Sequence, residues 1–124
     1  MILNLIPVEN IQLDQFRLTE LRARLGPRGA DELVSRAMEE LAVQLAKVHK
    51  AFEQNRVAEM QLAAKVIIEV SLHIGLNCLG RVAGDVASLS ASRDSAALAA
   101  SASRLSRIGE SSLVAVWDLQ DLSV

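Results

Sequence analysis

Large aromatic residues are almost absent from this sequence, which has no tyrosine, one tryptophan and two phenylalanines. Aromatic residues are enriched in β-strands, so their scarcity beside many alanines and leucines argues against a sheet-based fold. Proline is scarce as well: the two prolines are Pro7 and Pro27, so no proline interrupts a helix after residue 27. These shortages leave a chain of 124 residues that can form long helices and is expected to fold as one domain.

The single cysteine, Cys78, excludes a disulfide within the chain and a zinc site built on cysteines. It lies in an apolar run, so we expect a buried small side chain rather than a reactive thiol. The sequence also lacks a helical His-x-x-x-His pair, a glycine-rich phosphate loop and a cluster of carboxylates and histidines with ligand spacing. We therefore expect no metal, no cofactor and no enzymatic activity beyond, at most, that of a phosphoryl carrier.

No long run of one charge is present. The net charge is -2, and the acidic and basic residues are mixed along the chain. Without a basic run or an aromatic platform, nucleic acid is not an expected partner. The N-terminal "MILNLIPV" has no basic residues and does not resemble a signal peptide, and the apolar run from Val66 to Leu79 is too short and polar to span a bilayer. We expect a cytoplasmic protein that does not bind membranes.

Apolar residues at helical spacing fill most of the chain. Four long helices are predicted over about residues 30–54, 56–74, 76–90 and 95–117, after a shorter helix that begins at Asp14 and ends at "GPRG", residues 26–29. The clearest stripe alternates steps of three and four: Val34, Met38, Leu41, Leu45, Val48 and Phe52. The expected fold is an all-α antiparallel four-helix bundle with an additional N-terminal helix. It would occupy residues 10–118, between an arm (residues 1–9) and a tail (residues 119–124).

Two kinds of short signal refine this prediction. Asn55, Gly75 and the stretch "SASRD", residues 90–94, are expected to separate the long helices. Gly80 and Gly84 are four residues apart, so they either allow a neighbouring helix to approach closely or simply weaken their own helix.

The helix predicted over residues 56–74 has a distinct outer face. On a helical wheel with about 100° per residue, the core side holds Ala63, Val66, Ile67, Val70 and Ile74. The outer side carries a polar row, Gln61, Lys65, Glu69 and His73, with Ile68 and Leu72 beside it. Lys65 and Glu69 are spaced for an exposed ion pair. The apolar residues beside the row leave two alternatives open: a surface that docks a protein partner, or partial cover by the N-terminal helix.

The order and lengths of these elements resemble the histidine-containing phosphotransfer (HPt) domain of two-component phosphorelays, over about residues 10–118. "LDQFRLTELRARLG" is similar to the family's N-terminal helix, and "ADELVSRAMEELAVQLAKVHKAFEQN" to its second helix. "VAEMQLAAKVIIEVSLHIGLNCLGRVAGDVASL" is similar to its active helix, the loop glycine and the next helix, and "RDSAALAASASRL" to the start of its last helix. The resemblance implies a signalling protein whose partners are response-regulator receiver domains or sensor kinases.

The reactive motif of that family, roughly Ala-His-x-x-Lys-Gly with a later glycine, is only partly present. Ala64 and Gly75 match the alanine and the later glycine. At the other three positions the residue types differ: Lys65 replaces the histidine, Ile68 the lysine and Glu69 the first glycine. A protonated lysine has no lone pair with which to attack an aspartyl phosphate, so Lys65 cannot accept a phosphoryl group.

Three hypotheses follow. The first is a non-phosphorylatable HPt-like adaptor or competitor whose partner-binding residues are Gln61, Lys65, Ile68, Glu69 and Leu72. The second is a working phosphotransfer protein that uses His73. The other histidine, His49, is expected to be a surface residue near a helix end. The third is a structural bundle that forms a homodimer through the same outer apolar residues.

Overall fold

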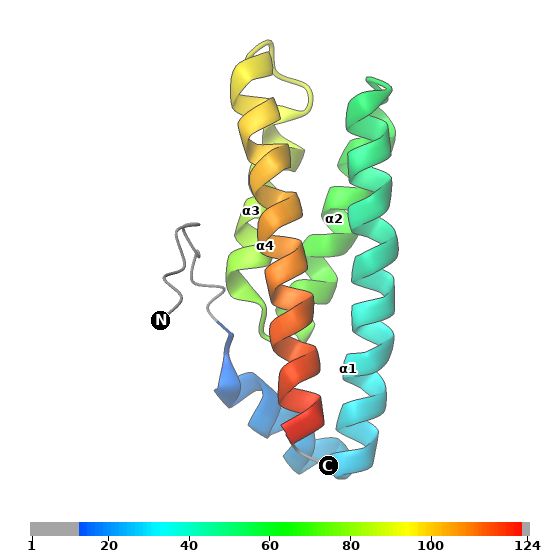
Figure 1. The fold of residues 1–124 in the computed structure, drawn as a ribbon, viewed down its shortest axis with the longest axis vertical. Helices are drawn as coiled ribbons and strands as arrows, with labels where there is room; N and C mark the ends of the chain where they lie inside the picture. The colour runs from blue at the N-terminus through cyan, green and yellow to red at the C-terminus, as the bar shows by residue number, and fades with distance from the viewer. Residues whose placement is uncertain (1–12, 123–124) are drawn as a thin grey trace, which may run out of the picture.

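The computed structural model describes residues 13–122, which form four helices. These are α1 (Gln15–Glu53), α2 (Val57–His73), α3 (Asn77–Leu89) and α4 (Ser95–Leu122). Each helix packs against the next along the chain, and α4 packs back against α1. Figure 1 shows the chain alternating in direction from one helix to the next. The all-α antiparallel four-helix bundle is therefore confirmed, while the predicted arm, residues 1–9, lies outside the described residues.

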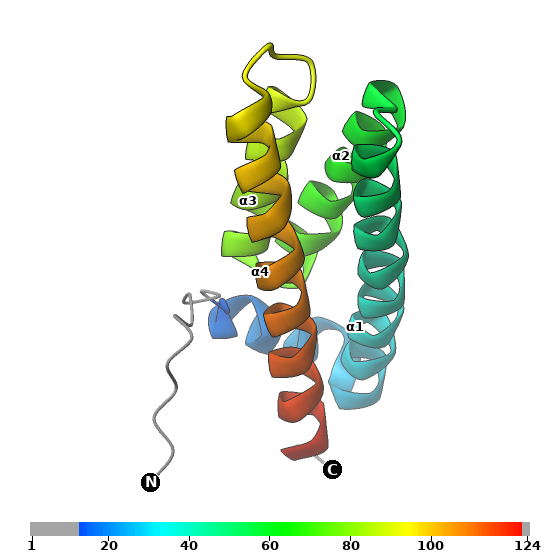
Figure 2. The ribbon, with the colours of Figure 1, turned by 45° about the horizontal axis from the view of Figure 1, so that its top comes forward.

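The expectation of a separate N-terminal helix was wrong. The described residues contain no fifth helix, because the first part of α1 joins the long second part with only Gly26 outside helical geometry. Gly26 has φ 76° and ψ 164°, a region that is almost exclusive to glycine. Pro27 follows, and its fixed φ suits the first position of a helix, so the helix restarts at once. The chain bends here, and Figure 2 shows the first part of α1 lying across the end of the bundle.

The helix ends agree with their predicted signals. Asp14 caps α1 by accepting a hydrogen bond from the Arg17 amide at 3.1 Å, and Asp94 accepts one from the Ala97 amide at 2.9 Å at the start of α4. Asn55 has φ 55° in the turn between α1 and α2. The exception is the end of α4, which continues past Trp117 to Leu122 and so includes residues that we assigned to a tail.

One apolar core lies between the four helices. In the predicted stripe of α1, Val34, Met38, Leu41 and Val48 are buried, and Leu45 and Phe52 are partly buried against the same core. Cys78 is buried as expected. Of the two glycines on α3, Gly80 lies against α2, but a Cβ there would meet the Cβ of Ser71 at 3.7 Å, an ordinary contact distance that does not require glycine. Nothing lies within 4 Å of a Cβ at Gly84, so that glycine does not mark a helix contact.

Candidate functional site

The candidate site lies on one side of α2, and we call its predicted residues the α2 face: Gln61, Lys65, Ile68, Glu69 and Leu72. Lys65 and Glu69 are exposed, and Leu72 is 56% exposed. Gln61 and Ile68 are partly buried. The α2 face therefore has charged groups in solvent and one strongly exposed leucine near the end of the helix.

The core side of α2 differs from the prediction. Its buried residues are Met60, Ala63, Ala64, Ile67 and Ser71, whereas Val66 and Val70, expected in the core, are only partly buried. α3 lies against the Ser71 side of α2, where a Cβ at Gly80 would contact the Ser71 Cβ at 3.7 Å.

Two apolar side chains on the outer side of α2 also differ in exposure from the prediction. Ile68, expected to point outward, packs partly against the core. Leu62 is 67% exposed. The exposed large apolar residues of α2 are thus Val57, Leu62 and Leu72, and the last two lie on either side of Lys65 along the helix. Leu62 was not among the residues predicted for the α2 face.

Lys65 and Glu69 are not paired with one another. Within residues 13–122 no ion pair includes either side chain, although their spacing permits one. Both charged groups are therefore available to a partner without first breaking an internal contact.

The first part of α1 covers the end of α2, not the middle of the α2 face. The Asp14 amide donates a hydrogen bond to the Gly75 carbonyl at 2.8 Å, Leu13 and Leu76 form an isolated β-bridge, and Arg17 Nε donates to the His73 carbonyl at 3.0 Å. Gly75 itself has φ 81° and lies against Asp14. The glycine shared with the HPt pattern is thus required here by backbone geometry and by this contact.

The two histidines are both exposed. His73 is the last residue of α2, and among the described residues its imidazole has no ion-pair partner. His49 lies on α1, with Nε2 at 3.4 Å from Glu53 Oε1. Neither belongs to a group that could hold a metal ion, since the described part of the chain contains no cluster of three or more histidine, cysteine, aspartate or glutamate side chains.

Comparison with known proteins gives no match, whether by family models, curated protein sequences or solved structures. Within residues 13–122, none of the helices has the length and apolar character needed to cross a membrane.

Proposed function

We propose that this chain is an HPt-like signalling protein that binds a receiver domain through the α2 face without accepting its phosphoryl group. The observation that carries the proposal is the exposure of Lys65 in the middle of α2, at the position where the HPt pattern has its histidine. The overall four-helix arrangement with an N-terminal part across one end is compatible with that family's fold, an HPt-like bundle.

The chemistry of the α2 face supports binding over phosphotransfer. An exposed lysine is protonated at neutral pH and has no free electron pair for attack on phosphorus. Glu69, one turn away, is also exposed and would repel an incoming phosphoryl group. Lys65 and Glu69 can instead form the polar rim of an interface, with Leu72 as its apolar centre.

The first test is transfer of phosphate from a purified receiver domain labelled with ³²P on its aspartate. We expect the chain to remain unlabelled. Acid-labile label that disappears in His73→Gln would overturn the proposal and support a phosphotransfer protein that uses His73, whose imidazole is exposed.

The second test is binding of the same receiver, measured by isothermal titration calorimetry with Leu72→Asp. A charge in the apolar centre of an interface should weaken binding by about 1–3 kcal/mol, roughly 5- to 150-fold. Val43→Asp is the matched control, because Val43 is 50% exposed on α1, outside the α2 face. Equal affinities for the two variants would contradict the proposal, and a homodimer that Leu72→Asp alone dissociates in size-exclusion chromatography would support the structural bundle instead.

A further inference from the structure

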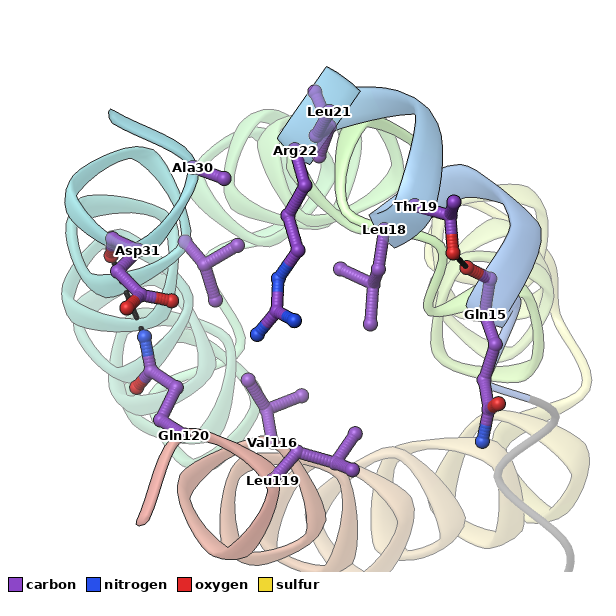
Figure 3. Close-up of a pocket in the computed structure, with 11 residues that line it drawn as sticks. Gln15, Leu18, Thr19, Leu21, Arg22, Ala30, Asp31, Val116, Leu119 and Gln120 are labelled. Carbon is purple, nitrogen blue, oxygen red and sulfur yellow. Dashed lines mark hydrogen bonds between the residues drawn. The ribbon is translucent and has the colours of Figure 1, made fainter. Parts of the chain in front are cut away.

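A pocket lies at the end of the bundle where α1 bends, far along the chain from the α2 face. It has a volume of about 300 Å³ and is enclosed by both parts of α1 and by the last turns of α4 (Figure 3). Small-molecule sites begin at about this size. None of its lining residues comes from α2, so whatever binds here is independent of the proposed function.

The walls of this pocket are apolar and well fixed. They consist of Leu18, Leu21, Ala30, Val34, Val116 and Leu119. Leu21 and Val116 are almost completely buried, and Val34 belongs to the main core. Gln120, at the rim, donates hydrogen bonds to the Asp31 carbonyl at 3.3 Å and to Ser35 Oγ at 3.2 Å, which ties α4 to α1. The pocket is therefore preformed by packing that the fold already requires.

Two opposite charges also line the pocket. Arg22, an exposed residue, lies before the Gly26 bend, and the partly buried Asp31 lies after it. Figure 3 shows the Arg22 side chain directed into the pocket and the Asp31 carboxylate at its edge, on the side of Gln120. Within residues 13–122 no ion pair joins them, and neither charged group has another partner. A guanidinium and a carboxylate that face one apolar pocket without pairing offer separate contacts to a ligand of matching charges.

We propose that this pocket binds a small zwitterion of the α-amino acid class with an aliphatic side chain. The ligand carboxylate accepts hydrogen bonds from Arg22, the ligand ammonium donates to Asp31, and the aliphatic side chain contacts the leucine and valine walls. A simple anion could pair with Arg22 but would be repelled by Asp31, and a simple cation could pair with Asp31 but would be repelled by Arg22. The volume holds roughly ten groups of the size of a water molecule, which corresponds to an amino acid such as leucine.

The probes are L-leucine and three analogues that each lack one feature. 4-Methylpentanoate lacks the ammonium, 3-methylbutylamine lacks the carboxylate, and glycine lacks the aliphatic side chain. Binding to the full chain is measured by isothermal titration calorimetry and by methyl NMR shifts of Val34 and Val116. We expect leucine to bind at least about tenfold more tightly than each analogue. A missing charged hydrogen-bonding group costs roughly that factor or more, and glycine loses the burial of the aliphatic side chain, which costs at least as much.

Two variants and two controls test the role of each charge. Arg22→Gln and Asp31→Asn should each weaken leucine binding by at least about tenfold. Asp31→Asn should at the same time strengthen binding of 4-methylpentanoate, because a repelling charge is removed. The controls are Arg24→Gln and Glu32→Gln, exposed neighbours that do not line the pocket, and they should leave leucine binding unchanged.

Three results would overturn the proposal. The first is no heat and no methyl shift with millimolar leucine, which would mean that the pocket is closed to ligands or taken by another part of the chain. The second is equal affinity of the wild-type chain for 4-methylpentanoate and leucine, which would show that Asp31 has no part in binding. The third is an equal loss of affinity in the two control variants, which would point to a general charge effect.

Discussion

Replacing Gly75 by alanine should clearly lower the free energy of unfolding, although Gly75 lies in a turn between two helices. The residue has φ 81°, and a Cβ added there would lie 2.8 Å from the backbone oxygen of Asp14 and 3.1 Å from its Cβ. Real Cβ atoms almost never approach another atom that closely, so Asp14 must move. That movement would break the hydrogen bond from the Asp14 amide to the Gly75 carbonyl.

The magnitude follows from two contributions. Alanine at positive φ costs about 1–2 kcal/mol. Loss of the Asp14–Gly75 hydrogen bond costs about 0.5–1.5 kcal/mol more. We therefore expect Gly75→Ala to lower the free energy of unfolding by about 1.5–3.5 kcal/mol, a large share of the typical stability of about 5–15 kcal/mol.

Urea unfolding followed by circular dichroism measures this loss, with two further variants for comparison. Gly75→Asn tolerates the positive φ better but keeps the steric overlap, so it should remain clearly destabilised. Gly84→Ala has open space around the new Cβ and lies inside α3, so it should gain about 0.5–1 kcal/mol. A value for Gly75→Ala within about 0.5 kcal/mol of wild type would refute the reasoning, because neither the torsion nor the contact with Asp14 would then matter.

Two other predictions concern the core. The hydroxyl groups of Ser71 and Ser112 are buried without a hydrogen-bond partner among the described residues. Ser71→Ala and Ser112→Ala should therefore each raise the free energy of unfolding, by up to about 1–2 kcal/mol. A lower free energy of unfolding in urea would show that the hydroxyls do have partners. A Cβ at Gly109 would lie 2.7 Å from Leu45 Cδ1, so the Leu45 side chain must move and Gly109→Ala should not bring the gain of about 0.5–1 kcal/mol expected for Gly84→Ala. In a Leu45→Ala background the same change should be more favourable, and additive effects in this double-mutant cycle would contradict the contact.

The sequence allowed prediction of the elements whose signals are local. The stripe of α1 alternates by three and four, and the ends at Asp14, Asn55 and Asp94 depend on residues that cap or turn the chain by themselves. Gly26 shows the limit of such signals. "GPRG" is typical of a loop, yet only Gly26 leaves helical geometry, because the proline that follows begins a new helical turn.

The site was predicted less well, because its geometry depends on packing between helices. Hydrophobicity favoured Val66 and Val70 as core residues over Ser71, but Ser71 is fully buried on the side of α2 that contacts Gly80 of α3. The pocket could not be predicted at all. Arg22 and Asp31 carry no motif, and they share a pocket only because the torsion angles of Gly26 bend α1 between them.

The contact between the first part of α1 and the α2–α3 turn has a consequence for local unfolding. The Asp14 amide and the Arg17 side chain donate to carbonyls of the α2–α3 turn, so the start of α1 and this turn are expected to open together. Stretches far apart in the sequence thus form a single cooperative unit at this end of the molecule. The Asp14 amide, which donates to the Gly75 carbonyl, should exchange with solvent when this contact opens, separately from the amides in the middle of α2.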